Sequence, residues 1–229
     1  MSARGAQAAR RRGTATAPGE LLADRAYAEL RDRIVTLAIP PGAPINEDAL
    51  GRALRMGRTP VREAIKRLAL ENLVTVFPRR GTFASEINIT DLAHISDVRV
   101  QLEGHAARRA AERLTAAHRD ELESLLGEIE RREGAGTRDP DTLMRLDAEI
   151  HRFVYRCAGN PYLQETLERY LNLSLRIWYL VLDRLPHLVD RVHEHRALLE
   201  AIASGDGAHA QAVAAEHVGV FEAEIRGVL

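Results

Sequence analysis

The sequence predicts a mainly α-helical protein with a small mixed N-terminal part and an all-helical C-terminal part. Helical and strand patterns alternate only up to residue 85, whereas apolar residues beyond residue 90 recur only with helical spacing. The charge divides at the same place. Residues 1–85 hold 15 basic and 8 acidic residues, and the remainder holds 17 and 25. A basic part on an acidic remainder favours a polyanion-binding module joined to a module of another kind.

The N-terminal part begins with a segment that cannot form a core. Residues 1–19 include Arg10–Arg12 and almost no bulky apolar side chain, so we expect a disordered basic tail. An apolar stripe then predicts a helix over 20–38, which Pro40-Pro41-Gly42 should end.

Two short helices are expected next, at 47–54 and 59–70. In the turn between them we expect Gly57 to adopt a positive φ. Thr59 is the expected N-cap of the second helix, with Pro60 at its first position.

A hairpin should complete this part of the chain. Residues 74–77 and 82–84 predict two strands, and Pro78–Gly81 predicts the turn between them. Three helices and a hairpin within 20–85 match a winged helix-turn-helix, whose second turn helix enters the DNA major groove.

The remaining chain, 90–229, should form an antiparallel helical bundle. Thr90, Thr115, Asp139 and Asn160 are the expected N-caps. Six helices are expected, at 90–113, 116–132, 140–158, 161–184, 187–203 and 206–227.

The 59–70 helix carries the strongest sign of nucleic-acid binding. Cations recur every four residues on one face, opposite an apolar face that can dock on the domain. Alone, such a face indicates solvated surface, but the helix-turn-helix context favours DNA, because an arginine fork can bond guanine O6 and N7. The candidate DNA contacts on this helix and the hairpin tip are Arg58, Arg62, Lys66, Arg79, Arg80 and Gly81.

The motif Arg58-Thr-Pro-Val-Arg-Glu-Ala64 resembles the DNA-binding domain of the GntR superfamily. Pro41-Gly42, Asn46-Glu47, Arg67-Leu68 and Leu73-Val74 extend the likeness. The resemblance implies that Arg58, Thr59, Arg62 and Gly81 contact an operator. Gly57 departs from the family, which usually has Ser or Thr there, so one phosphate hydrogen bond is expected to be absent.

Four polar residues on apolar helix faces predict a metal site. Asp147 and His151 lie four residues apart, and His195 and His217 lie on the apolar stripes of two later helices. Burying such groups unpaired costs several kcal/mol, and a shared ion would satisfy them. A single such histidine would favour hydrogen bonding to a neighbour, but this set favours Zn, Ni, Mn or Fe with an open coordination position. His193 lies on a polar flank, where we expect it to be exposed.

Residues 90–227 resemble the FadR-type C-terminal domain (FCD), in its six-helix, VanR-like form. The resemblance implies a homodimer and an organic-acid effector, and the spacing of the four polar residues resembles the metal-binding subset of that family. Arg99 points inward and either pairs with Glu103 or binds an effector carboxylate. The 161–184 helix is apolar nearly all round, so Tyr170 and Asn172 are candidates to line the effector cavity.

The sequence therefore predicts a DNA-binding transcriptional regulator. As a homodimeric repressor or activator it would bind an inverted repeat in double-stranded DNA and respond to a small carboxylate held near a divalent metal. The alternative is a metal-dependent enzyme fused to a DNA-binding module, but no His-Glu-x-x-His motif, phosphate loop or nucleophile elbow is present. A purely architectural DNA-binding protein would not need inward polar residues.

No apolar run reaches the ~20 residues that span a bilayer, and the arginines near the N-terminus are not followed by the apolar stretch of a signal peptide. The single cysteine, Cys157, suits a reducing compartment. We expect a cytoplasmic protein with no membrane partner.

Overall fold

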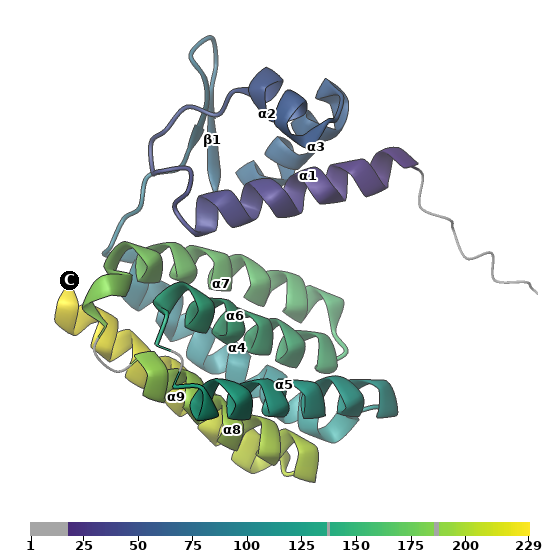
Figure 1. Ribbon diagram of the computed structural model, residues 1–229, viewed down its shortest axis with the longest axis vertical. Helices are drawn as coiled ribbons and strands as arrows, with labels where there is room; N and C mark the ends of the chain where they lie inside the picture. The colour runs from purple at the N-terminus through teal and green to yellow at the C-terminus, as the bar shows by residue number, and fades with distance from the viewer. Residues whose placement is uncertain (1–17, 137, 186–187) are drawn as a thin grey trace, which may run out of the picture.

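The computed structural model describes residues 18–136, 138–185 and 188–229. The expected tail lies outside the described residues, apart from its last two positions, and so do Arg10–Arg12. The mainly helical, two-part fold is confirmed (Figure 1). No helix among the described residues is both long and apolar enough to cross a membrane.

Residues 18–85, the winged part, contain three helices and one hairpin within the described chain. The strands are antiparallel, with Val74 opposite Ala84 and Phe77 opposite Gly81. Leu30, Ile34, Val61 and Leu68 are buried at the centre of this part. Its elements are α1 (Pro18–Val35), α2 (Glu47–Leu54), α3 (Arg58–Leu70), β1 (Val74–Phe77) and β2 (Gly81–Ala84).

The turn between α2 and α3 differs from the prediction. Arg55 has the positive φ of 54°, whereas φ of Gly57 is −69°. The left-handed residue follows the end of α2 directly, and the Met56 amide donates to the Gly51 carbonyl at 2.8 Å, which closes the last helical turn. Helix α3 begins one residue early, at Arg58, so Thr59 lies inside it and is not the N-cap.

Residues 91–229, the helical part, form the bundle. Thr115, Asp139 and Asn160 cap their helices with side-chain oxygens, as predicted. Thr90 makes no such bond, because its own backbone is already helical and its hydroxyl donates to Asn88 Oδ1 at 2.8 Å. The helices are α4 (Asp91–Arg113), α5 (Ala116–Gly134), α6 (Pro140–Cys157), α7 (Pro161–Val181, extended by a 3₁₀ turn over Leu182–Arg184), α8 (Leu188–Ser204) and α9 (Gly207–Val228).

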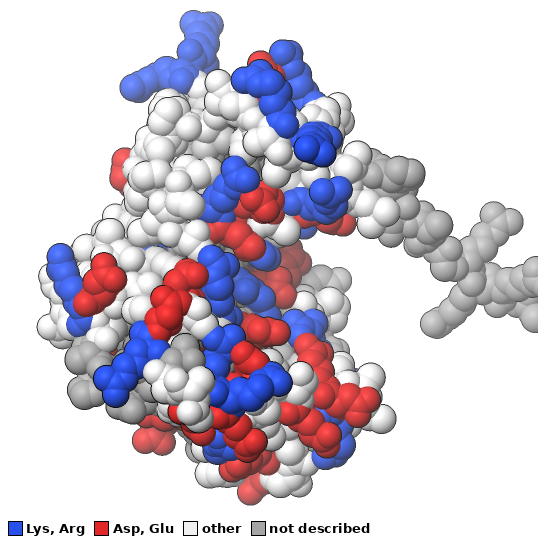
Figure 2. Space-filling model, viewed as in Figure 1, with Lys and Arg blue, Asp and Glu red and all other residues white. Residues whose placement is uncertain are grey.

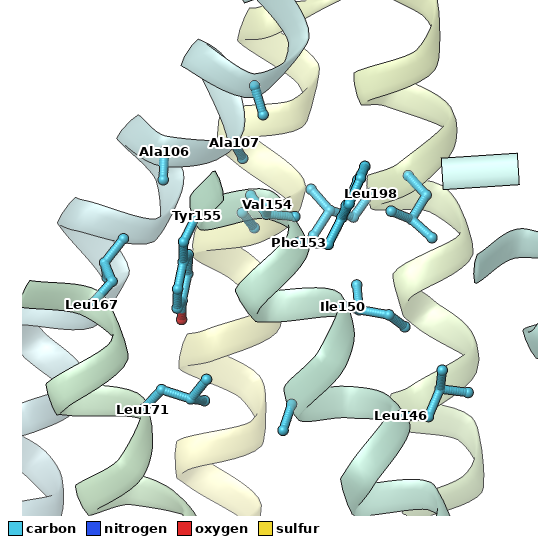
Figure 3. Packing of buried hydrophobic residues seen from close by; sticks show 14 of the residues in the cluster. Ala106, Ala107, Leu146, Ile150, Phe153, Val154, Tyr155, Leu167, Leu171 and Leu198 are labelled. Atoms are coloured by element: carbon cyan, nitrogen blue, oxygen red, sulfur yellow. The ribbon is translucent and has the colours of Figure 1, made fainter. Parts of the chain in front are cut away.

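Helix α6 supplies much of the bundle core. Leu146, Ile150 and Phe153 are almost fully buried and lie among side chains of neighbouring helices (Figure 3). Full burial of each such side chain contributes roughly 1.5–3 kcal/mol. The polar residues of α6 that face the same way therefore occupy a largely dry interior.

The two parts meet where α1 lies against α7 (Figure 1). Arg176 on α7 also donates a hydrogen bond from Nη2 to the carbonyl oxygen of Ser85, the first residue after β2. The bundle is thus joined to the winged part by helix packing and by a polar contact to the connecting segment.

Candidate metal centre and nucleic-acid interface

The outer face of α3 carries the predicted cations. Arg58, Thr59, Arg62 and Lys66 are all exposed, while Val61, Ala64, Ile65 and Leu68 of the same helix are buried. This division follows the helical spacing of the sequence. One face of α3 therefore holds the helix in the domain and the other is free for a partner.

Acidic neighbours on α2 and α3 hold these cations in the structure. Arg62 Nε lies 2.7 Å from Glu47 Oε2, and Arg58 Nε lies 2.8 Å from Asp48 Oδ1. Lys66 pairs with Glu63 at 2.8 Å. Exposed pairs of this kind contribute little to stability, so the cations can exchange a carboxylate for a phosphate or a base edge at small cost.

The hairpin tip presents a second group of cations. Arg79, with a φ of 64°, and Arg80 are exposed, and neither forms an ion pair within the described part of the chain. Gly81 takes a φ of 106°, which an L side chain rarely adopts. In Figure 2 the cations gather over the hairpin and the short helices, whereas both charges intermix over the helical part.

Sequence analysis missed two further exposed arginines beside this surface. Arg52 and Arg55 lie at the C-terminal end of α2 and form no ion pair with other described residues. The signal that could have indicated them is their position at the end of the helix that precedes α3.

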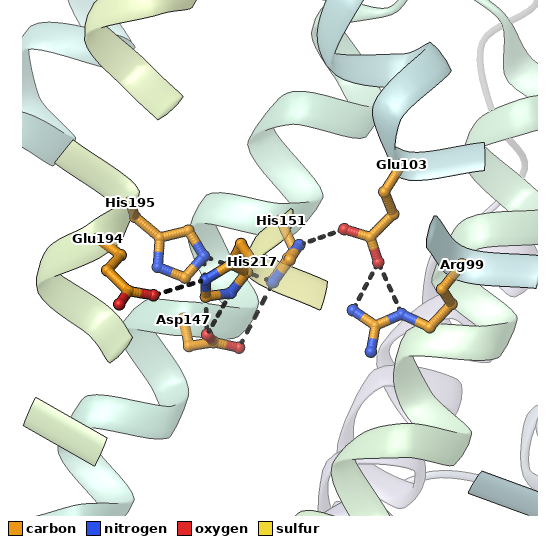
Figure 4. A network of polar contacts seen from close by, with 7 residues as sticks. All are labelled: Arg99, Glu103, Asp147, His151, Glu194, His195 and His217. Atoms are coloured by element: carbon orange, nitrogen blue, oxygen red, sulfur yellow. Dashed lines mark hydrogen bonds and ion pairs between the residues drawn. The ribbon is translucent and has the colours of Figure 1, made fainter. Parts of the chain in front are cut away.

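The four predicted metal ligands meet in the helical part. Asp147 and His151 come from α6, His195 from α8 and His217 from α9, and none is more than 6% exposed. One ligand atom from each lies within 4.8 Å of those of the other three (Figure 4). Residues separated by up to 70 positions in the sequence therefore converge on one point.

The spacing of these atoms fits a shared ion. His151 Nε2 and His195 Nε2 are 3.4 Å apart. Asp147 carboxylate oxygens lie 3.8 Å from His151 Nε2, 3.7 Å from His195 Nε2 and 3.9 Å from His217 Nε2. Atoms held about 2.0–2.2 Å from one ion in a tetrahedral arrangement are roughly 3.3–3.6 Å apart. A small contraction of the cluster would reach that geometry.

Hydrogen bonding leaves part of this cluster unsatisfied. Asp147 Oδ2 and both ring nitrogens of His217 are buried and form no hydrogen bond among the described residues, although Glu194 Oε2 lies at ion-pair distance, 3.5 Å, from His217 Nδ1. Buried polar atoms normally have one, and each exception calls for an explanation. One carboxylate and three imidazoles are suitable ligands for a transition metal, so the donor set fits such an ion.

Glu103 on α4 contacts the ring nitrogen of His151 that points away from the cluster. Its Oε2 lies 2.7 Å from His151 Nδ1, and its Oε1 lies 2.6 Å from Arg99 Nε (Figure 4). Burial alone would raise the pKa of Glu103, but Arg99 and His151 outweigh it and lower the pKa to about 2. The ionised carboxylate thus holds a metal-ligand candidate on one side and a buried arginine on the other.

Arg99 forms the ion pair with Glu103 that was one of its two predicted alternatives. It is 1% exposed, pairs with Glu103 and lies with its guanidinium carbon 4.9 Å from the centre of the Trp178 ring. Its charge is therefore compensated within the protein.

Tyr170 and Asn172 on α7, the two residues predicted to line the effector cavity, form no hydrogen bond or ion pair with the four-residue cluster among the described residues. Tyr170 is half-buried in a groove between the winged and helical parts, together with Tyr27 and Arg67, and not beside the cluster. Asn172 is buried and accepts a hydrogen bond from Arg152 at 3.3 Å. His193 is partly buried, not exposed, because Glu133 on α5 lies 3.7 Å from its Nδ1.

A cavity of about 280 Å³ reaches the cluster between α8 and α9. It is lined by His217 together with Glu194 and Glu216. Glu194 Oε2 lies 3.5 Å from His217 Nδ1. Two carboxylates at this entrance favour the approach of a cation.

Comparison with known families gives two matches. Residues 22–84 match the family described as bacterial regulatory proteins, gntR family, and residues 94–220 match the FCD domain. The two matched segments correspond to the winged and helical parts of the structure.

Characterised relatives match over most of the chain. It is 25% identical over 211 residues to the HTH-type transcriptional repressor RspR of Escherichia coli (strain K12), covering 92% of each protein. It is 27% identical over 180 residues to the HTH-type transcriptional regulator McbR of the same organism, covering 78% of this chain and 80% of McbR. The solved structure of E. coli McbR/YncC shares the fold, with a TM-score of 0.77 at 24% identity over 90% of this chain and 97% of that one.

Proposed function

The chain belongs to the gntR family of bacterial regulatory proteins and carries an FCD domain, and on this basis we propose that it is an effector-controlled, metal-containing repressor. Its characterised relatives are named as transcriptional regulators, so we propose no catalytic activity. One observation carries the proposal beyond the family: Asp147, His151, His195 and His217 converge in the buried interior of the bundle.

These four residues would hold a divalent transition metal, with Zn, Ni, Mn or Fe as candidates. When bound, the metal would supply a Lewis-acidic centre with an open position for an anionic ligand. Asp147 would give an oxygen and the histidines a ring nitrogen each. The acidic cavity beside His217 offers the ion a path to the cluster.

The effector we propose is a small organic carboxylate that binds at this centre. Arg99 is already compensated by Glu103, and Tyr170 lies in a different groove, so neither is needed as the primary contact. The carboxylate must bind the two conformations of the regulator unequally in order to change its affinity for DNA.

The operator would be read by a homodimer. One α3 helix contacts only a few base pairs, and two-fold pairing doubles the recognised sequence. The contacts would come from α3 and the hairpin tip, with Arg52 and Arg55 as further candidates for phosphate. We propose that the dimer acts on an inverted repeat in the cytoplasm.

Footprinting and anisotropy on the neighbouring promoter test this function. The metal-loaded protein should protect two half-sites related by a dyad, and one member of a carboxylic-acid panel should release the DNA. The His195→Ala variant should still bind the operator but lose the response to the acid. A monomer that binds one asymmetric site with equal affinity, or release that His195→Ala leaves unchanged, would contradict the proposal.

A further inference from the structure

A second cavity, away from the Asp147 cluster, lies at the junction of the two parts. Its volume is about 700 Å³. The wing contributes Val74, the connecting segment contributes Ser85, and helices α4 and α7 contribute Ile95 and Leu173. Any molecule bound there would touch both parts of the chain.

Arg176 is the unusual member of this lining. It is 2% exposed, donates one hydrogen bond from Nη2 to the Ser85 carbonyl, and leaves its buried Nε without a hydrogen-bond partner among the described residues. Arg99, the other arginine buried in the described chain, has Glu103 as its counter-ion. No carboxylate of the described residues lies within ion-pair distance of Arg176.

Glu86 lines the same cavity and acts on Arg176 through its charge, but its carboxylate forms no ion pair with Arg176 in the described structure. A Cβ at Gly42 would come within 2.3 Å of Glu86 Oε1, so this carboxylate packs directly over the Gly42 backbone. Burial lowers the pKa of the Arg176 guanidinium to about 10, so it remains charged at neutral pH. A buried charge without a close counter-ion is costly and provides a ready contact for an anion.

The rest of the lining indicates which anion would fit. Val74, Ile95, Leu173 and Ile177 make part of the wall apolar, and polar side chains line another part. The exposed carboxylates of Glu86 and Asp91 at the rim would repel a dianion more strongly than a monoanion.

We propose that this cavity is a second effector site, in which Arg176 binds the carboxylate of a small monocarboxylic acid with an apolar body. The acid and the Ser85 carbonyl would both accept hydrogen bonds from the Arg176 guanidinium. Ser85 is in turn tied to the winged part, because its amide donates a hydrogen bond to the carbonyl of Leu73, the residue before β1, at 3.0 Å. Binding would therefore act on the joint that sets the orientation of the winged part. The site has no lining residue in common with the Asp147 cluster.

Thermal unfolding of the full chain in chelator tests this site with benzoate as the probe. Benzoate should raise the melting temperature saturably by about 2–8 °C, whereas the neutral isostere benzamide should not. Phthalate, a dianion, should bind at least tenfold more weakly than benzoate. The Arg176→Met variant should lose the benzoate response, while Arg145→Met, which removes an exposed cation from α6, should keep it.

Two more variants make the outcome decisive. His195→Ala should keep the benzoate response, because it alters only the cluster. Leu173→Trp places a larger side chain at the apolar wall of the cavity without removing a charge, and it should abolish the response. This variant tests the site even if Arg176→Met does not fold. A response that survives in Leu173→Trp, one that His195→Ala abolishes, or no benzoate-dependent shift in the parent would each overturn the proposal.

Discussion

Glu103 Oε2 lies 2.7 Å from His151 Nδ1, and this contact fixes how His151 faces the cluster. With Nδ1 donating to the carboxylate, the lone pair of Nε2 points toward Asp147 and His195. A carboxylate behind a histidine is the usual arrangement that orients a metal ligand and increases its basicity. The contact spans 48 positions of sequence and joins α4 to α6.

Glu103→Gln should weaken metal binding about 10–100-fold, because the amide orients His151 less firmly and carries no charge. Competition with a chelator of known affinity measures this. Glu112→Gln, on the exposed side of the same helix, is the matched control and should bind metal like the parent. Equal affinities for Glu103→Gln and the parent would show that the contact does not support the site.

Arg99→Met should destabilise the metal-free protein by roughly 3–5 kcal/mol, since it leaves the buried Glu103 carboxylate without its arginine. The expected fall in melting temperature is about 2–4 °C for each kcal/mol. Thermal unfolding in chelator checks it against Arg108→Met, which breaks an exposed pair on the same helix. A loss of stability as small as that of the control would mean that Glu103 is satisfied by other groups.

Arg62→Ala should reduce specific operator affinity by roughly 5–150-fold, because it removes a side chain placed to contact a base or the backbone. Among the described residues its ion pair is with the partly buried Glu47 at the surface of α2, so the fold should survive. Anisotropy with operator and with scrambled DNA measures the specific and general components. Parental affinity for the operator would show that α3 is not the helix in the groove.

Arg80→Ala, at the hairpin tip, should act differently from Arg62→Ala. A phosphate contact contributes to all sequences alike, so operator and scrambled DNA should both bind more weakly. The slope of log affinity against log salt should fall by about one unit. A loss of affinity for the operator alone would contradict a phosphate contact and would indicate that Arg80 contacts the bases.

The sequence predicted the helices well because apolar spacing and N-caps are local signals. It placed α2 at the residues observed and α6 within one residue of its end. The prediction for the turn before α3 was wrong. The residue with a positive φ is the one that directly follows the end of α2, and that residue is Arg55 and not Gly57.

Long-range partners were harder to predict. The four cluster residues could be grouped because each is a polar residue on an apolar face. Glu103 was recognised only as a partner of Arg99 on its own helix, since nothing local points to His151. Helix α7 is apolar on most sides, so its pattern could not indicate that Tyr170 faces the winged part or that Arg176 reaches the connecting segment.

The most direct test of the account is metal analysis of protein purified without a polyhistidine tag and before any chelation. We predict close to one equivalent of a transition metal per chain in the parent and in His193→Ala. His195→Ala should hold less than a tenth of an equivalent and melt at a lower temperature, because the assembled site exists only in the folded chain. Less than a tenth of an equivalent in the parent, with no thermal shift on addition of Zn, Ni or Mn, would contradict the metal centre.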